Sequence, residues 1–478
     1  MSPIRSAFTP PHANAVFCNR TLNMRAIQAV GFDMDYTLVH YDEPVWEERA
    51  YSHVLRRLQS RGLPVSGLTF DAHAFTRGLV IDTKLGNICK ANRFGYVTRA
   101  AHGMRMLPHD EQRRVYSQVW VDLSESRWVF LNTLFSLSES CLYAQLVDLL
   151  DQGALPPELD YEGLYKFVVD AMNAAHLEGE LKAEIIANPE RFVMLDPDLP
   201  RALLDLKQAG KRLFLATNSE WHYTLPMMHY AFDRYLKRGT WRDLFDLVIV
   251  QARKPGFFEG DAPFFEILDD TGATKPLEGP LRKGHCYRGG NAQVVQDYLA
   301  TSGEDVLYVG DHVYADVHVS SQIRRWRTAL VLRELEAEVA QEETFVGTRN
   351  ALRAAMKEKE LLEREQATLR LALLRIESKE PLPPQVTGNA STIHERLRSL
   401  RVETDALDAQ IAPLAKLASE FGNERWGPLM RAGNDKSRLA RQIERYADVY
   451  TSRVANLLHL TPFGYLRAAR GSLPHDPD

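Results

Sequence analysis

The stretch AIQAVGFDMDYTL, residues 26–38, joins a short apolar run to two closely spaced aspartates, Asp33 and Asp35. An apolar run that stops at acidic, turn-forming residues predicts a buried strand followed by a turn. Taken alone, the Asp-x-Asp-x-Thr pattern is also typical of a strand end whose carboxylates accept hydrogen bonds from backbone amides. The other strand-like segments of the chain show whether Asp33 and Asp35 merely form a turn or belong to a functional site.

Three later segments repeat the pattern of an apolar run that leads to polar residues. They are KRLFLATNS (211–219), LFDLVIVQARKPG (244–256) and EDVLYVGDHVYAD (304–316). Near-continuous apolar strands separated by helical stretches are typical of a parallel sheet covered on both faces. Ligands of such sheets bind at the carboxyl ends of the strands, so we expect the polar residues that follow these runs to meet there.

The chain of 478 residues is long enough for two or three modules. We expect an N-terminal arm at 1–25 and an α/β core of the Rossmann type at 26–45 and 190–337. Residues 46–189 interrupt this core and contain helical patterns such as ESCLYAQLVDLL and LYKFVVDAMNAAHL. They predict a mainly helical cap domain inserted into the core.

From 338 to 420 the sequence is rich in Ala, Glu, Arg and Leu, with apolar residues at alternating spacings of four and three. The intervening KEPLPPQVTGN (379–389) cannot be helical. Two heptad arms around such a turn predict an antiparallel coiled-coil hairpin, which we interpret as a contact in a homo-oligomer, a dimer or tetramer. The segment 421–478 is too apolar for a disordered end and is expected to be helical and to pack on the core.

Composition excludes several classes of function. The formal charge of −5 argues against binding nucleic acid through its phosphates. The chain has neither a long apolar leader at its start nor an apolar run of about 18 residues, so we expect no membrane span. Its four cysteines are widely scattered, which is typical of reduced thiols in the cytoplasm.

The polar residues at the strand ends are those that phosphoryl transfer through a carboxylate requires. A carboxylate repels a phosphate dianion unless cations neutralise the pair, and Mg²⁺ held by Asp33 and Asp311 together with Lys254 would do so. Asp35 lies on the same side of an extended segment as Asp33 and can protonate the leaving alcohol and later deprotonate a water. Thr217 and Asn218 can donate hydrogen bonds to the phosphate oxygens.

These strand-end motifs resemble those of the haloacid dehalogenase (HAD) superfamily. Further segments resemble, more closely, the cytosolic IMP/GMP-preferring purine 5'-nucleotidases and their bacterial relatives, from about Phe17 to His475 except in the hairpin arms. These segments are FTRGLVIDTKLGN, FLNTLFSLSESCLYAQLVD, VQARKPGFF, YRGGN, VGDHVYADV, WRTALVLREL and RYADVYTSRVANLL.

The resemblance implies a role for each strand-end residue. Asp33 would be the nucleophile and Asp35 the general acid and base. Mg²⁺ would be held by the carboxylates of Asp33 and Asp311 and by the backbone carbonyl of Asp35. The phosphate contacts would be Thr217, Asn218, Ser219 and Lys254, with Asp316 as a supporting carboxylate. The expected substrate is a nucleoside 5'-monophosphate, and phosphate transfer to a nucleoside is an expected side activity.

In the cap, the resemblance assigns base recognition to Phe135, His176 and Lys182. From the residues alone, each has a plainer interpretation: Phe135 as a core residue, His176 as a surface or core histidine, and Lys182 as a solvated lysine. The family's arginine and aspartate upstream of this histidine are Val169 and Asn173 here. These two departures favour an alternative, a HAD phosphatase for a different phosphomonoester.

A nucleotide effector is a further expectation of the resemblance. The family has a lysine-rich, phosphate-binding stretch where this chain reads VHVSSQI (317–323), whereas Asn132 and Tyr314 match amide and aromatic positions nearby. A second alternative, from another class, is a nucleotide-sensing interaction protein with little turnover. A general acid such as Asp35 argues against it, because binding alone does not require one.

Overall fold

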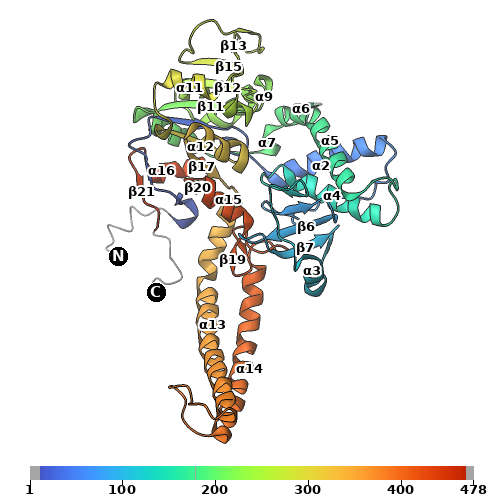
Figure 1. Cartoon of the computed structure of the whole chain (residues 1–478). Helices are drawn as coiled ribbons and strands as arrows, with labels where there is room; N and C mark the ends of the chain where they lie inside the picture. The colour runs from blue at the N-terminus through green and yellow to red at the C-terminus, as the bar shows by residue number, and fades with distance from the viewer. Residues whose placement is uncertain (1–10, 178, 470–478) are drawn as a thin grey trace. The chain divides into compact units, whose positions relative to one another are not determined.

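The computed structural model describes residues 11–177 and 179–469, and all side chains in these ranges except those of 175–177 and 419–420. Its contacts divide the chain into two units, residues 1–337 with 429–478 and residues 338–428. The first unit contains a ten-stranded sheet in the order β1-β20-β17-β16-β3-β11-β12-β15-β13-β14. Figure 1 labels several of these strands, among them β11, β12 and β17. The second is a pair of long helices.

The centre of the large sheet is parallel, as the sequence predicts. β3 (Ala29–Phe32) lies between β16 (Val306–Gly310) and β11 (Arg212–Ala216), and β11 pairs with β12 (Leu247–Val250). Each adjoining pair among β20, β17, β16, β3, β11, β12 and β15 is parallel, while β1, β13 and β14 pair antiparallel at the edges.

Alternate side chains of the central strands enter two hydrophobic cores. Val30 and Phe32 of β3 belong to a core that also contains residues of α8 (Leu199–Gln208) and α9 (Trp221–Phe232). Ala29, on the other face, packs with residues of α10 (Gly256–Glu259) and α11 (Ala292–Leu299). Helices therefore cover both faces, which explains why these strands are almost wholly apolar.

A cap is inserted between β3 and β11, and its two connections to the core pair with each other. β4 (His40–Tyr41) and β10 (Val193–Met194) form a short antiparallel ladder at this neck. Beyond it, α2 (Glu43–Ser60), α4 (Ser136–Asp151) and α5 (Tyr161–Leu177) contact one another. The neck therefore ties the first and last residues of the insertion together.

The expectation of a mainly helical cap missed a five-stranded antiparallel sheet. Its order is β8-β7-β6-β5-β9, with β5 (Val80–Asp82), β6 (Asn87–Ala91), β7 (Val97–His102), β8 (Arg105–Met106) and β9 (Trp128–Phe130). These strands are short, and segments such as NICKA and VTRAAH carry Lys, Arg and His. Such segments lack the apolar run or the clean alternation by which a strand is recognised.

The two ends of the first unit also differ from expectation. The C-terminal segment is not purely helical, because β20 (Val449–Thr451) extends the parallel sheet beside β17 (Arg327–Val331). β1 (Phe17–Cys18), in the expected arm, pairs with β20. Strands of two or three residues are too short to show a period, so they cannot be recognised from the pattern of apolar residues. Residues 1–10 of the arm and 470–478 lie outside the described residues.

The second unit is an antiparallel helical hairpin of α13 (Leu335–Glu377) and α14 (Ala390–Glu420), which lie side by side in Figure 1. Glu365 pairs with Arg396, and Lys359, earlier on α13, pairs with Asp408, later on α14. The two helices therefore run in opposite directions. Leu369, Ala372, Ile393 and Leu400 form the buried seam. The predicted hairpin and its non-helical turn are confirmed.

In the described ranges, no helix combines the length and the apolarity that crossing a bilayer requires.

Candidate active site

The register of the three central strands brings their terminal residues to one edge of the sheet. Phe32 of β3 lies opposite Leu215 of β11 and Val309 of β16. Asp33 follows Phe32 directly, and its backbone N–H donates to the carbonyl of Val309 at 2.9 Å. Thr217 and Asp311 follow the other two strands within two residues. The residues predicted at separate strand ends therefore share one edge.

Three of the carboxylates at this edge form a cluster. Asp33, Asp311 and Asp316 are all buried, and one oxygen from each lies within 4.8 Å of the others. Asp33 keeps 13% of its side chain exposed, against 1% for Asp316, so Asp33 is the more open of the two. Burial raises the pKa of Asp33 to about 6 and that of Asp311 well above its usual value, and Asp316 adds to both shifts by repulsion.

Lys254 is the cation of this cluster. Its Nζ lies 2.8 Å from Oδ1 of Asp33 and 2.7 Å from Oδ1 of Asp316, and 2% of the side chain is exposed. Burial alone would lower the pKa of Lys254, but Asp316 and Asp33 outweigh it and raise the pKa well above its usual value. Lys254 therefore stays charged and neutralises one of the three carboxylates.

Gly310 allows Asp316 to reach this lysine. A Cβ atom at residue 310 would lie 2.5 Å from the carboxylate of Asp316, closer than any real contact. Oδ2 of Asp316 also accepts a hydrogen bond from the backbone N–H of His312 at 3.1 Å. The acidic cluster therefore requires glycine at residue 310, because any side chain there would displace the carboxylate of Asp316.

The cluster suits a divalent cation. Three carboxylates and one ammonium leave two negative charges, which are costly to bury without a counterion. Among the residues that the structure describes, Oδ2 of Asp311 is buried and has no hydrogen-bond partner. An all-oxygen set of carboxylates is what Mg²⁺ prefers. Asp33 and Asp311, the two predicted carboxylate ligands, are both in the cluster.

Asp35 has a different environment from the cluster. Its Oδ1 accepts a hydrogen bond from the hydroxyl of Tyr41 at 2.5 Å, and its Oδ2 accepts one from Oγ of Ser219 at 2.6 Å. Burial and the nearby Asp33 raise the pKa of Asp35. A carboxyl group whose pKa is raised, close to a second carboxylate that can react, is suited to carry a proton.

The residues that follow β11 are engaged with neighbouring groups. Asn218 Oδ1 accepts from the backbone N–H of Lys254 at 2.6 Å, and its Nδ2 donates to the carbonyl of Lys254 at 3.1 Å. Oγ1 of Thr217 accepts from the backbone N–H of Ser219 at 3.1 Å. The structure therefore shows Asn218 fixing the Lys254 loop and Ser219 holding Asp35. The phosphate contacts expected of these two residues stay a prediction.

Two of the predicted base-contacting residues have visible partners. The ring of Phe135 packs edge-on against Tyr36 and Trp46, with ring centroids 4.7 and 4.8 Å away. Lys182, on α6 (Glu180–Ala187) of the cap, pairs with Glu220 at 2.6 Å. Glu220 directly follows Ser219, so Lys182 lies near the group that holds Asp35. His176 is on α5, but its side chain lies outside the described residues.

Three residues of the site were missed by the sequence analysis. Tyr308, inside β16, accepts a hydrogen bond from Nζ of Lys254 at 3.2 Å and donates to the carbonyl of Ala216 at 2.9 Å. Tyr41 binds Asp35, and Arg77 of the cap donates to the carbonyl of Asp311. Tyr308 occurs in an apolar run typical of a core strand, Tyr41 lies between polar residues with no motif around it, and Arg77 is distant in sequence. Only the fold reveals their partners.

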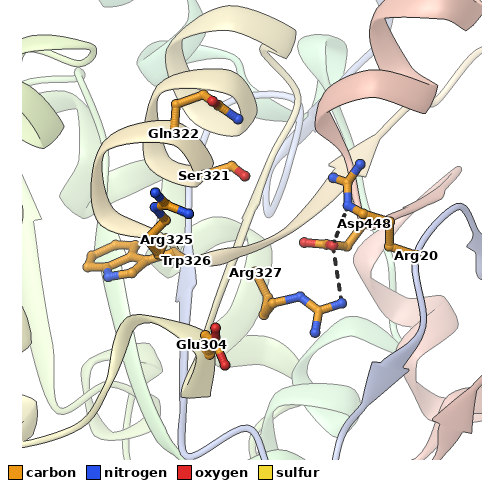
Figure 2. Close-up of a pocket in the computed structure, with 8 residues that line it drawn as sticks. All are labelled: Arg20, Glu304, Ser321, Gln322, Arg325, Trp326, Arg327 and Asp448. Atoms are coloured by element: carbon orange, nitrogen blue, oxygen red, sulfur yellow. Dashed lines mark hydrogen bonds and ion pairs between the residues drawn. The ribbon is translucent and has the colours of Figure 1, made fainter.

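A cavity of about 530 Å³ lies at the opposite edge of the sheet, where β16, β17 and β20 begin. Figure 2 shows the residues that line it. Several lining residues precede or begin β16, β17 and β20, whereas the acidic cluster follows strands. Two of its arginines, Arg20 and Arg327, pair with Asp448 at 2.8 and 3.1 Å. The full lining is Arg20, Glu304, Ser321, Gln322, Arg325, Trp326, Arg327 and Asp448. This cavity is separate from the candidate active site.

A family model and two related proteins match nearly the whole chain. The model of the 5' nucleotidase family matches residues 16–478. A 5'-nucleotidase domain-containing protein of Dictyostelium discoideum is 28% identical over 473 residues, which is 96% of this chain and 74% of that protein. The 5'-nucleotidase domain-containing protein 2 of Rattus norvegicus is 28% identical over 483 residues, covering 97% and 80%. An archaeal beta-phosphoglucomutase structure from Pyrococcus sp. strain ST 04 aligns with a TM-score of 0.30 and 11% identity, covering 64% of this chain and 86% of that one.

Proposed function

The chain belongs to the 5' nucleotidase family, and we propose that it hydrolyses nucleoside 5'-monophosphates, with purine nucleotides such as IMP and GMP as substrates, through a phosphorylated Asp33. The observation that carries the proposal is the cluster of Asp33, Asp311 and Asp316 around Lys254 at the carboxyl edge of the sheet. Asp33 is the reacting carboxylate because it is the more exposed of the two that contact Lys254.

In the first step, a carboxylate oxygen of Asp33 attacks phosphorus and the bond from phosphorus to the 5' oxygen breaks. Asp35, whose pKa is raised by burial, gives its proton to that oxygen and the nucleoside leaves. In the second step, Asp35 takes a proton from water as the water oxygen attacks phosphorus. The bond from Asp33 to phosphorus then breaks, which releases phosphate and restores both carboxyl groups.

The charges at the site support these steps. Lys254 would attract the phosphate oxygens toward Asp33, while Thr217, Asn218 and Ser219 would orient the phosphate group. Asp33, Asp311 and the backbone carbonyl of Asp35 would hold Mg²⁺, supported by Asp316. When bound, the metal supplies positive charge that offsets the negative charge of the phosphate and carboxylates. Phe135, His176 and Lys182 would contact the base.

Phosphate release from a substrate panel tests this function. The panel contains IMP, GMP, AMP, UMP and a sugar phosphate, each with Mg²⁺ or with EDTA. We expect Mg²⁺-dependent release that is fastest for the purine nucleotides, and Asp33→Asn should abolish it while the protein stays folded. Preference for the sugar phosphate would favour the alternative of another HAD phosphatase, and no release from any substrate would favour a nucleotide-sensing interaction protein.

We also propose a nucleotide effector, which two features of the structure support. Tyr314 is 48% exposed, and the centroid of its ring lies 5.4 Å from that of His318, which in turn packs on Tyr446. An exposed aromatic ring can stack on a base. The cavity at the opposite edge of the sheet contains Arg325, and an arginine can bind a phosphate. Adding ATP to the substrate panel tests this part: a rise in rate supports it, and no change contradicts it.

The hairpin is proposed as the contact of a homo-oligomer. Leu361, Leu374 and Val402 are between 58% and 69% exposed on its helices, and apolar residues at such exposure are typical of contact surfaces. Light scattering during size-exclusion chromatography would give the mass in solution, with a dimer or tetramer expected. The cytoplasmic location stays a prediction, based on the scattered cysteines.

A further inference from the structure

Arg77 is a buried cationic side chain that no step above uses. It lies in the cap, just before β5, and 1% of its side chain is exposed. Its Nε donates to the carbonyl of Asn132 at 2.9 Å, and its Nη1 lies 3.5 Å from Oε1 of Glu334. Its Nη2 donates to the carbonyl of Asp311. One guanidinium thus contacts three separate segments of the chain.

Two of these segments lead to the candidate active site. Asp311 belongs to the acidic cluster, and its backbone carbonyl is part of the same turn that carries its carboxylate. Asn132 lies three residues before Phe135, in the cap loop that precedes α4. Arg77 therefore connects the proposed metal-binding turn of the core to the proposed base-contacting loop of the cap.

The chemistry of the contacts requires an arginine. A guanidinium presents several donors in a fixed plane and can bind two carbonyls and a carboxylate together. A lysine keeps the charge but is a single, flexible point of donation. Because buried carbonyl oxygens need donors, removing the guanidinium leaves the carbonyls of Asn132 and Asp311 free to move toward other partners.

Arg77 could act on metal affinity through its charge or through the position in which it holds Asp311, and the two roles predict opposite changes in affinity when Arg77 is replaced. A positive charge beside a cation site repels the cation, so a role through charge alone predicts tighter metal binding when Arg77 is neutralised. A role through position predicts weaker binding, because the carboxylate of Asp311 would no longer be held in place. The two roles can therefore be separated by experiment.

We propose that Arg77 is a positioning residue that holds the Asp311 turn for a divalent cation and ties it to the cap loop of Phe135. This inference rests on the proposed function, in which the acidic cluster binds Mg²⁺. It adds a cap residue to the determinants of metal affinity, although this residue touches neither the metal nor the substrate.

Calorimetric titration of the full-length protein with Mg²⁺ alone, without substrate, tests the proposal. Arg77→Lys and Arg77→Met are each expected to bind Mg²⁺ about tenfold more weakly, the size expected for losing a charged hydrogen bond. The Mg²⁺ concentration for half-maximal phosphate release should rise by the same factor. Arg127→Lys is the control, because Arg127 pairs with buried Asp82 inside the cap, at 2.6 Å, and its loss should leave Mg²⁺ binding unchanged.

The outcomes separate this inference from the proposed function. Normal Mg²⁺ binding by Arg77→Lys, with tighter binding by Arg77→Met, would overturn the positioning role alone. Absence of Mg²⁺ binding by the unmodified protein would overturn the metal assignment as well. If both Arg77 variants unfold, Glu334→Gln removes one contact of the guanidinium and keeps its charge. This variant should bind Mg²⁺ two- to threefold more weakly, on the order of a weakened ion pair, and unchanged affinity would overturn the inference.

Discussion

The ammonium of Lys254 lies 2.8 Å from Oδ1 of Asp33, and both groups are buried at the carboxyl edge of the sheet. The same ammonium contacts Asp316 at 2.7 Å. Without it, Asp33 and Asp316 would each lose a cation within 2.8 Å of the carboxylate. The ammonium of Lys254 therefore both stabilises the buried carboxylates and supplies the positive charge that the proposed reaction requires.

Lys254→Met should reduce both stability and turnover. Removing one partner of a buried ion pair leaves its carboxylates uncompensated and costs about 3–5 kcal/mol. Urea unfolding and phosphate release at saturating Mg²⁺ measure the two effects. Lys211→Met is the matched control, because Lys211 is also buried but donates to the carbonyls of Met24 and Ile27. Its loss should lower stability only, and equal turnover by both folded variants would contradict the role of Lys254.

Gly310→Ala should displace Asp316 from Lys254. The new Cβ would meet the carboxylate of Asp316 at 2.5 Å, and overpacking of this kind costs about 1–3 kcal/mol. We expect a lower melting temperature together with slower phosphate release. Gly67→Ala is a suitable control because a Cβ there meets no atom within 4 Å. Melting temperatures that fall equally in the two variants would show that the contact with Asp316 is unimportant.

The sequence predicted that Asp33, Lys254 and Asp311 meet because each follows a strand whose apolar character was clear, whereas the role of Asp316 was expected only from the resemblance. β3, β11, β12 and β16 could be located, and their parallel order then placed Asp33, Lys254 and Asp311 together. The sequence could not show that Asn218 and Ser219 engage Lys254 and Asp35, because such hydrogen bonds depend on loop conformation. The cap sheet escaped prediction for another reason: its strands are short and carry polar residues on buried positions, such as Asn87 and Lys90.

Glu220→Gln should change substrate affinity through Lys182. In the structure Lys182 pairs with Glu220 at 2.6 Å, so part of its charge is neutralised before a nucleotide binds. If Lys182 contacts the substrate, freeing it should lower KM by about threefold, which corresponds to a weak ion pair, and should leave kcat nearly unchanged. Lys182→Met should raise KM by a similar or larger factor. A KM that is identical in all three proteins would remove Lys182 from the substrate-binding residues.

Glu47 should make the stability of the cap fall as pH rises. Its side chain, on α2, is fully buried, and Oε2 accepts a hydrogen bond from the backbone N–H of Ser138 at 2.8 Å. Burial raises its pKa to about 8, and the nearby Glu43 and Glu139 add to this by repulsion, while the hydrogen bonds from Ser138 oppose it. Glu43 shifts in the same direction, to about 7.

The sign follows from which state binds more protons. An unfolded chain releases the proton of Glu47 near pH 4.3, whereas the folded protein keeps it until about pH 8. Between these values the folded state holds one proton more than the unfolded state. The contribution of Glu47 to the free energy of unfolding is therefore complete below about pH 4.3 and is lost as pH rises toward 8, by up to roughly 1.4 kcal/mol per pH unit.

Urea unfolding at pH 5.5, 7 and 8.5 measures this loss. Glu47→Gln cannot lose a proton, so its stability should vary less with pH and exceed that of the unmodified protein at pH 8.5. Glu48→Gln, at an exposed neighbour, should keep the original slope, and a slope unchanged by Glu47→Gln would show that another group causes the loss.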